Sequence, residues 1–344
     1  MLKITMYSSA DKVAGQGVGS AYIELVRMLR RNFAGEFDIK INSYRQSQIS
    51  HYHTIDLPFY FSTFSKKRGR KIGYVHFLPE TLEGSLKIPQ PFRSIFYKYV
   101  IAFYKRMDHL VVVNPSFIPK LEAYGIARDD ITYIPNFVDS DNFHPVDDQE
   151  KIRLRKKYHL AENSFVVLGS GQIQERKGVP DFIRLARQNP DIQFIWAGGF
   201  SFGMITDGYR ELKKVVDNPP KNLWFPGIVS RKEINELNNV ADLFLLPSFN
   251  ELFPMSVLEA FGSGTPVMLR DLSLYHSIIA GDYEPAKDVT EMQNKLRLLK
   301  DNRHALSALR QKAAQASAKY SKEHLAKIWH RFYIEQAQVG MNHD

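Results

Sequence analysis

The sequence predicts an α/β protein with two similar domains, each built on a parallel β-sheet covered by helices. Short apolar runs alternate with helical patterns along the chain, which is typical of βαβ units. The chain has 344 residues, more than a single hydrophobic core usually serves. The alternation also starts afresh near the middle of the chain, so two domains of comparable size are expected.

The first domain is predicted over residues 1–145. Its strand candidates are, in order, LKITMYS, DIKIN, HTIDLPFYF, KIGYVHF, HLVVVN and ITYIP. A glycine-containing loop, residues 15–19, follows the first strand and leads into the helical pattern AYIELVRMLRRNF. Strands joined through helices pair in parallel, so these runs are expected to form one sheet.

The second domain is predicted over residues 146–320, with strand candidates FVVLGSG, IQFIWAGG, LWFPG, DLFLLP and PVML. The polar, charged segment 139–163 marks the junction between the domains. Residues 286–338 show only helical patterns, and a last helix at about 321–340 is expected to pack back on the first domain. The two halves therefore resemble two Rossmann-like domains that face a central cleft, where a ligand would bind.

Composition limits the function classes. The chain has no cysteine, which excludes disulfides, thiolate nucleophiles and cysteine metal sites and fits a cytoplasmic protein. No run reaches the roughly 20 apolar residues that span a bilayer. The net charge is +9, and residues 1–145 carry 19 Lys/Arg against 13 Asp/Glu. A basic first domain indicates an anionic partner such as a membrane surface, a phosphorylated substrate or a nucleic acid.

Two acidic residues, Glu251 and Glu259, flank a segment between the apolar runs LFLLP and PVML. This order predicts a strand, a loop, a short helix and a second strand, and Pro254 suits the first turn of such a helix. Glu251 would then lie in the loop at the ligand-facing end of a parallel sheet, with Glu259 on the second turn of the helix. Carboxylates accept several hydrogen bonds, so the pair suits a polyhydroxylated ligand; two solvated acids on an ordinary helix are the alternative.

The second domain opens with FVVLGSG, followed by QIQERKG and a helical stretch. Gly171 lets the backbone approach a ligand, and Arg176 and Lys177 arrive at the same place. Unpaired N–H groups at a helix start and two cations would neutralise a diphosphate without a metal. A solvated turn is the alternative, but the position directly after a strand favours the phosphate site.

Two features of the first domain point to the same ligand. Residues 15–19 read GQGVG, which is not the pattern of a dinucleotide site, and Gly17 is better explained as leaving room for a phosphate or sugar. His76 ends the strand KIGYVHF, where an imidazole facing a cleft would hydrogen-bond a sugar hydroxyl or stabilise charge near a reacting carbon. A tight turn and a structural histidine are the alternatives.

Taken in order, GQGVG, VHF, GQIQERKG and the pair of glutamates with seven residues between them resemble the motifs of the retaining glycosyltransferases of family 4. The match runs over nearly the whole chain. The resemblance implies the GT-B architecture of two Rossmann-like domains around a cleft, a nucleotide-sugar donor, and no metal or other cofactor.

The resemblance also assigns the diphosphate of the donor to named residues. Arg176 and Lys177 would bind it and stabilise its charge as it leaves, and Gly17 and Gly171 would lie close to it. Many relatives carry an arginine two residues after the glycine of the phosphate loop, where this chain has Gln172. Arg176 would take over that role.

The sugar moieties of the donor are assigned in the same way. Glu259 would hold the ribose hydroxyls. Glu251 would contact hydroxyls of the transferred sugar, helped by the backbone N–H groups of Leu252 and Phe253. His76 would sit beside the anomeric carbon.

Substitution with retention at the anomeric carbon follows from this family. The sequence offers no obvious covalent nucleophile, so a front-face route is favoured over a double displacement through Glu251. Residues 139–141 read DSD, the DxD metal signature of another glycosyltransferase class. Because they follow a strand at the domain junction, a turn is favoured over a metal site.

Three longer stretches, VHFLPETLEGS, YKYVIAFYKRMDHLVVVNPSF and FPMSVLEAFGSGTP, are similar to bacterial diacylglycerol glycosyltransferases. They resemble the glycolipid synthases that add a second hexose to α-glucosyl-diacylglycerol. This implies a UDP-sugar donor carrying galactose or glucose and a glycolipid acceptor. Alternatives are a family 4 enzyme of cell-wall polysaccharide or teichoic-acid synthesis, and, from other classes, a non-catalytic sugar-binding protein or a nucleic-acid-binding protein. No nucleic-acid module is recognisable.

The segment 92–107, FRSIFYKYVIAFYKRM, places aromatic and apolar residues at helical spacing among Lys and Arg. A second basic cluster lies at 66–71. An aromatic, basic amphipathic helix suits the surface of an anionic membrane. We therefore expect a peripheral protein on the inner face of the cell membrane; an ordinary helix that packs in the core is the alternative.

Overall fold

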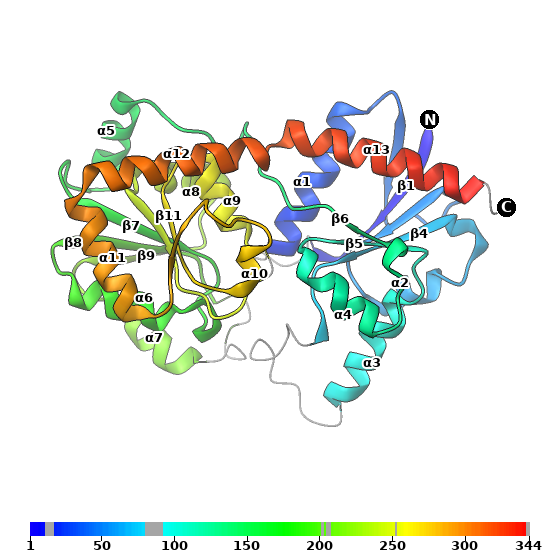
Figure 1. Ribbon diagram of the computed structural model, residues 1–344, viewed down its shortest axis with the longest axis horizontal. Helices are drawn as coiled ribbons and strands as arrows, with labels where there is room; N and C mark the ends of the chain where they lie inside the picture. Colours follow the sequence, from blue (N-terminus) through cyan, green and yellow to red (C-terminus); the bar gives the residue numbers. More distant parts are fainter. Residues whose placement is uncertain (11–16, 80–91, 201–202, 204–207, 252, 342–344) are drawn as a thin grey trace. The chain divides into compact units, whose positions relative to one another are not determined.

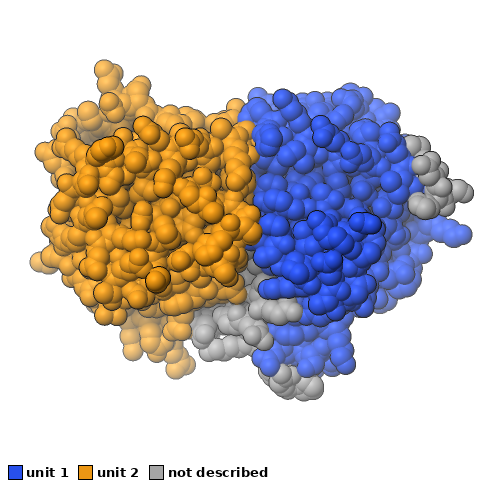
Figure 2. All heavy atoms as spheres, in the orientation of Figure 1, with its two compact units in different colours: residues 1–83, 88–137, 322–344 blue, residues 84–87, 138–321 orange. Residues whose placement is uncertain are grey.

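A computed structural model describes residues 1–10, 17–79, 92–200, 203, 208–251 and 253–341. These residues form two compact units, coloured separately in Figure 2. The first takes in the described residues up to 137 together with 322–341, and the second takes in residues 138–321. Each unit contains one parallel sheet, as the sequence predicts, and each sheet has six strands, of which β3 (Ile49–Tyr52) and β12 (Glu284–Ala286) were not among the predicted ones.

The sheet of the first unit has the strand order β2-β1-β3-β4-β5-β6 (Figure 1). Its strands are β1 (Leu2–Tyr7), β2 (Phe37–Ile41), β3 (Ile49–Tyr52), β4 (Arg70–Val75), β5 (His109–Val112) and β6 (Ile131–Tyr133). Its helices are α1 (Gly17–Asn32), α2 (Leu57–Ser62), α3 (Phe92–Tyr104), α4 (Ile118–Ala123) and α13 (Lys322–Met341).

One predicted strand is wrong. The run HTIDLPFYF, residues 53–61, was expected to be a strand, whereas β3 ends at Tyr52 and α2 begins at Leu57. Pro58 stands in the first turn of this helix, where its missing N–H costs nothing, and Asp56 precedes it in an extended conformation. A short apolar run fits a strand and a helix equally well, so periodicity alone misassigned it.

Helix α13 comes from the end of the chain yet belongs to the first unit. It contacts α1 and the strands β3 and β4. Its apolar residues follow the helical period and are buried, namely Leu325, Trp329, Phe332 and Tyr333. This stripe attaches the helix to the sheet that contains the N-terminal strand.

The sheet of the second unit has the order β12-β11-β10-β7-β8-β9. Its strands are β7 (Phe165–Ser170), β8 (Ile192–Ala197), β9 (Leu223–Gly227), β10 (Leu243–Leu246), β11 (Val267–Arg270) and β12 (Glu284–Ala286). Its helices are α5 (Asp148–Lys157), α6 (Val179–Gln188), α7 (Tyr209–Asp217), α8 (Arg231–Val240), α9 (Met255–Gly262), α10 (Ser273–His276), α11 (Val289–Asp301) and α12 (Arg303–Lys319). If the strands of this sheet are renumbered along the chain from β7, which becomes strand 1, the order is 6-5-4-1-2-3. This is the strand order of a Rossmann fold.

The two units part at residues 137 and 138, earlier than the sequence boundary at 145. Hydrogen bonds attach the intervening segment to the second unit. The N–H of Val138 donates to the carbonyl of Tyr320, 3.1 Å away, and the N–H of Val146 donates to the Asn239 side chain at 2.8 Å. Both partners lie far along the chain from this segment, so the amino-acid composition around residue 145 gives no sign of these bonds.

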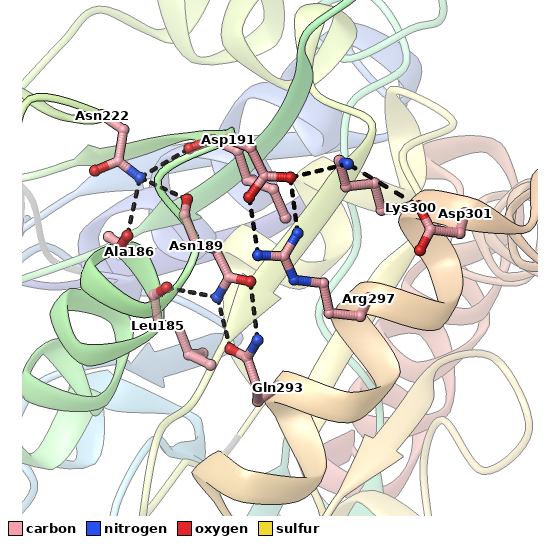
Figure 3. A network of polar contacts seen from close by, with 10 residues as sticks. Leu185, Ala186, Asn189, Asp191, Asn222, Gln293, Arg297, Lys300 and Asp301 are labelled. Carbon is pink, nitrogen blue, oxygen red and sulfur yellow. Dashed lines mark hydrogen bonds and ion pairs between the residues drawn. The ribbon is translucent and has the colours of Figure 1, made fainter.

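Helix α11 is fastened to the turn between α6 and β8 by polar contacts (Figure 3). The amides of Asn189 and Gln293 exchange two hydrogen bonds, of 2.6 and 2.9 Å. The carboxylate of Asp191 accepts two bonds from Arg297, of 2.7 and 2.8 Å, and pairs with Lys300 at 2.9 Å. These contacts stabilise the packing of α11 against the turn between α6 and β8.

In each sheet the chain reverses its winding direction between two neighbouring strands. The reversal falls between β1 and β3 in the first unit and between β7 and β10 in the second. Ligands of open α/β sheets bind outside the carboxyl ends of the strands at this point. The loops after these four strands are therefore the first places to look for function.

Candidate functional site

The reversal point of the second unit holds three of the predicted site residues. Arg176 and Lys177 lie in a 3₁₀ turn, Glu175–Lys177, in the segment between β7 and α6, and Glu251 lies in the loop between β10 and α9. The Nζ of Lys177 and the Oε1 of Glu251 are 2.5 Å apart. Arg176 donates from Nη1 to the carbonyl of Asn250 at 2.6 Å. The structure thus brings together residues that lie 74 positions apart.

The close approach of these two loops depends on a glycine. Gly178 has φ of 70°, and a Cβ there would lie 2.1 Å from the carbonyl oxygen of Pro247. Only glycine fits this conformation and this contact. The N–H of Phe249 then donates to the carbonyl of Arg176 at 2.9 Å, which fixes the register of the two loops.

Burial and charge together set the protonation of the site. Glu251 is only 6% exposed. Its burial alone would raise its pKa, but Lys177 and Arg176, with hydrogen bonds from Lys177 and Ser248, hold the pKa below its ordinary value. Burial, and secondarily repulsion by Arg176, lowers the pKa of Lys177 despite its pairing with Glu251. Two cations facing one carboxylate leave an excess positive charge, which suits an anionic ligand.

Further details of this site favour a ligand. The Nε of Arg176 is buried without a hydrogen-bond partner among the described residues. At Gly171, φ is 134° and a Cβ would meet nothing nearer than the Lys177 side chain, at 3.8 Å. Space therefore remains in front of the backbone at the end of β7. The side-chain oxygen of Gln172 accepts a hydrogen bond from the side chain of Gln174.

Glu259 lies on the second turn of α9 and is partly exposed. Burial raises the pKa of its carboxyl, and Arg231 acts in the opposite direction. Leu252 lies outside the described residues. Phe253 is buried and its ring packs 5.1 Å from that of Tyr320, centroid to centroid. The predicted roles of these residues toward a ribose and a sugar stay predictions.

The site residues of the first unit lie near its own reversal point. His76 follows β4 directly and is buried, which lowers the pKa of its imidazole to about 3 and keeps the ring neutral. Gly17 is the first residue of α1. The rest of the preceding loop, residues 11–16, lies outside the described part of the chain.

The DxD signature forms a turn. The carboxylate of Asp139 accepts a hydrogen bond from the N–H of Asp141 at 3.1 Å and another from the side chain of Asn142 at 3.2 Å. Across the residues that the structure describes, no three or more His, Cys, Asp or Glu side chains form a group that could hold a metal ion.

Sequence reasoning missed two neighbours of the predicted glutamates. The hydroxyl of Ser248 donates to the Oε1 of Glu251 at 2.7 Å. Arg231, at the start of α8, acts electrostatically on Glu259. Ser248 stands three residues before Glu251 in the same loop, so local spacing would have suggested it. Arg231 gives no such signal, because 28 positions of chain separate it from Glu259 and only the tertiary fold brings them near.

Family models match both halves of the chain. Residues 150–319 match the model of the glycosyl transferases group 1, and residues 15–142 match that of glycosyltransferase family 4. The alpha-galactosylglucosyldiacylglycerol synthase of Streptococcus pneumoniae is 54% identical over 340 residues, covering 98% of this chain and 91% of that protein. The processive diacylglycerol alpha-glucosyltransferase of Acholeplasma laidlawii is 32% identical over 208 residues, 58% of this chain and 61% of that protein.

Solved structures agree on the fold. The sucrose-phosphate synthase of Thermosynechococcus elongatus superposes with a TM-score of 0.81 at 14% identity, covering 98% of this chain and 100% of that one. HepE of Anabaena, solved in complex with UDP-glucose, gives a TM-score of 0.77, also at 14% identity, over 97% of this chain and 100% of that one. The motifs, the family matches and the two-sheet architecture lead to one conclusion: the chain belongs to the family 4 glycosyltransferases with the GT-B fold.

Proposed function

We propose that this protein transfers a hexose from a UDP-sugar to glucosyl-diacylglycerol and so makes a dihexosyl-diacylglycerol. The observation that carries the proposal is the 54% identity to a galactosylglucosyldiacylglycerol synthase over 98% of the chain. A glycolipid acceptor is thereby favoured over the soluble or polyprenyl-linked acceptors of cell-wall synthesis. The name of that relative describes galactose added to glucosyl-diacylglycerol, and we take galactose as the sugar.

The donor diphosphate belongs in the second unit, at the reversal point between β7 and β10. Arg176 and Lys177 supply two cations at a site that holds one carboxylate, so the site has an excess positive charge that would attract a diphosphate. As the bond between the anomeric carbon and the phosphate oxygen breaks, negative charge grows on that oxygen. Cations already fixed in place stabilise this charge without having to reorganise.

Retention by a front-face route fits the state of Glu251. Its Oε1 is engaged by both Lys177 and Ser248, and its lowered pKa makes it a weak base. A carboxylate held in this way is suited to accept hydrogen bonds from sugar hydroxyls rather than to attack carbon. In the front-face route the acceptor oxygen bonds to the anomeric carbon, and its proton passes to the leaving phosphate oxygen. Neutral His76 would contribute a hydrogen bond near that carbon.

Exposed apolar side chains on α2, on the turn that follows it and on α3 suit a membrane-bound acceptor. Five of them are between 58% and 67% exposed, namely Leu57, Phe61, Phe64, Phe92 and Ile95. The two helices are side by side, because the hydroxyl of Tyr99 on α3 donates to the carbonyl of Ile55 and Arg106 donates to that of Thr63 at 3.2 Å. We name these five residues the apolar patch of the first unit.

Basic residues accompany the apolar patch. Lys66, Lys67 and Lys98 are exposed, and each lysine near an anionic surface contributes about 1 kcal/mol to binding. The other members of the basic cluster at 66–71 serve the fold instead: Arg68 is buried against Tyr7, and Lys71 pairs with Asp108 at 2.8 Å. The described helices include none with the length and apolar character needed to cross a bilayer. Peripheral binding through the apolar patch, on the inner face of the membrane, completes the proposal.

A product assay tests the proposal. The protein would be incubated with vesicles containing α-glucosyl-diacylglycerol and with labelled UDP-galactose or UDP-glucose, and the lipids analysed by thin-layer chromatography and mass spectrometry. Vesicles with plain diacylglycerol serve as control. A dihexosyl lipid formed from UDP-galactose is expected. Labelled product on plain diacylglycerol alone would assign the protein to the first glycosylation step instead.

A further inference from the structure

Three histidines form a buried column on one face of the first sheet. His51 and His53 are two residues apart along β3 and its extension, and residues so spaced face the same side. The ring centroids of His51 and His53 are 4.1 Å apart, and those of His53 and His76 are 5.9 Å apart. His76 follows β4, so the column reaches from the middle of the sheet to the carboxyl ends of its strands.

The column is enclosed by aromatic residues from both covering helices. The ring of Tyr22 on α1 lies 4.9 Å from that of His53, and the ring of Trp329 on α13 lies 5.7 Å from that of His51. All three histidines are less than 5% exposed. Burial lowers the pKa of His51 and of His76 to about 3 and holds that of His53 well below its ordinary value, so the three rings are neutral near pH 7.

Most ring nitrogens of the column have no hydrogen-bond partner in the part of the protein that the structure describes. The Nδ1 of His51 bonds to the hydroxyl of Tyr333 at 2.7 Å. Four buried ring nitrogens have no hydrogen-bond partner among the described residues: His51 Nε2, His53 Nδ1, His53 Nε2 and His76 Nε2. A neutral imidazole carries one N–H, so His53 holds a buried donor and a buried acceptor that are both unpaired. Groups of this kind are rare in native proteins and usually bond to an internal water.

We propose that His53 is a positioning residue for His76, acting through a buried water that bonds to ring nitrogens of both. A water has two donors and two acceptor sites, and buried waters commonly make about three bonds. Such a water would have bonding capacity left for the Nε2 of His51, which also has no partner among the described residues. The chain Tyr333, His51, water, His53 and His76 would then fix which nitrogen of His76 carries the proton and how its ring is turned. This inference rests on the proposed function only in giving His76 a task near the reacting sugar.

The test compares His53→Phe, which keeps ring size and removes both nitrogens, with His53→Asn, which keeps a donor and an acceptor. His109→Asn is the matched control, because His109 is also buried in this sheet but is bonded to Thr132 at 2.8 Å and is outside the column. The ring nitrogens of His76 are followed by NMR of histidine-labelled protein, with assignment by His76→Gln. Turnover, KM for donor and acceptor, and thermal unfolding are measured on the same samples.

We expect His53→Phe to change the ring ¹⁵N shifts of His76 and to lower kcat about tenfold, the effect of one lost hydrogen bond, with KM for the donor unchanged. His53→Asn should recover most of kcat, and His109→Asn should leave the His76 shifts in place. Identical His76 shifts in wild type and His53→Phe would overturn the inference. Changed His76 shifts with unchanged turnover would show that His53 positions His76 but that His76 has no role in the reaction.

A second measurement covers the case in which His53→Phe does not fold. A high-resolution crystal structure of the wild-type protein should show an ordered water within hydrogen-bonding distance of the rings of His53 and His76. Direct packing of the rings, with no water between them, would contradict the inference without reference to any variant.

Discussion

Lys177 and Glu251 form an ion pair, with 2.5 Å between Nζ and Oε1, that joins the turn before α6 to the loop after β10. Both side chains are withdrawn from water, so their attraction is strong and so is the penalty of leaving either one alone. The pair joins the two loops at which we propose that the donor binds, and its neighbour Arg176 leaves the site one positive charge in excess.

Replacing Lys177 by alanine should reduce kcat/KM by about 100-fold or more, because a cation fixed beside the leaving diphosphate is lost. Lys151→Ala is the matched control: Lys151 pairs with Asp242 at 3.5 Å, and Asp242 lies at the amino end of β10, whereas Glu251 follows its carboxyl end. Activity would be measured at saturating acceptor, with circular dichroism to confirm folding. A folded Lys177→Ala protein with wild-type turnover would show that the diphosphate does not bind at this site.

Replacing Glu251 by alanine separates the two routes to retention. If Glu251 orients the sugar, the variant should be slow and azide should not restore it. If Glu251 attacks the anomeric carbon, azide would occupy the space left by the side chain and give a glycosyl azide of inverted configuration. Mass spectrometry of the reaction mixture with and without azide distinguishes the two. We expect no azide product.

The buried histidine column predicts loss of stability in mild acid. The unfolded state takes up protons on these histidines below about pH 6.5, whereas the folded state holds their pKa far lower, to about 3 for His51 and His76. The stability they contribute is complete above pH 6.5 and is lost as the pH falls toward 3. Each such histidine contributes a slope of about 1.4 kcal/mol per pH unit.

Urea unfolding at pH 7.5, 6.5, 5.5 and 5.0 measures this slope before most carboxylates titrate. The free energy of unfolding should fall steadily below pH 6.5, and the fall should be shallower in His53→Phe. A flat profile between pH 7.5 and 5.0 would show that the column is protonated or solvated in the folded protein.

Membrane binding should depend on the apolar patch of the first unit. Phe61→Ser and Phe92→Ser each remove an exposed aromatic ring, and each should weaken binding to anionic vesicles about tenfold or more, given the 1.5–3 kcal/mol gained on burying such a side chain. Leu298→Ser is the control, since Leu298 is 55% exposed on α11 of the second unit. Co-sedimentation with vesicles gives the binding constants. Equal losses in all three variants would mean that no single patch docks the protein.

The sequence alone places Arg176, Lys177, Glu251 and Glu259 on the correct loops and helix because their spacing is local. Glu251 and Glu259 lie within one strand–loop–helix segment, and Arg176 and Lys177 follow a strand, so secondary structure suffices to place each of them. Their meeting across 74 positions follows from the parallel pairing of β7 with β10, which alternating strands and helices already imply.

Other features need the folded chain. His53 was assigned to a strand with polar and apolar neighbours. Nothing in that pattern indicates that its ring lies near those of His51 and His76, with neither nitrogen bonded to a described residue. Arg68 read as part of a surface cluster, yet it is buried and bonded to the hydroxyl of Tyr7 and the carbonyl of Ser43. Only the tertiary fold brings such partners to a long polar side chain. A prediction from composition therefore assigns the side chain to the charged surface.

The anomeric configuration of the lipid product provides the decisive measurement. The protein would convert UDP-α-galactose and α-glucosyl-diacylglycerol on vesicles, and proton NMR of the purified lipid would give the coupling constant of the new anomeric proton. We predict one dihexosyl lipid with an α linkage, as expected when the leaving diphosphate and the acceptor occupy the same face of the sugar. A β linkage, or no dihexosyl lipid from an active and folded protein, would contradict retaining transfer to this acceptor.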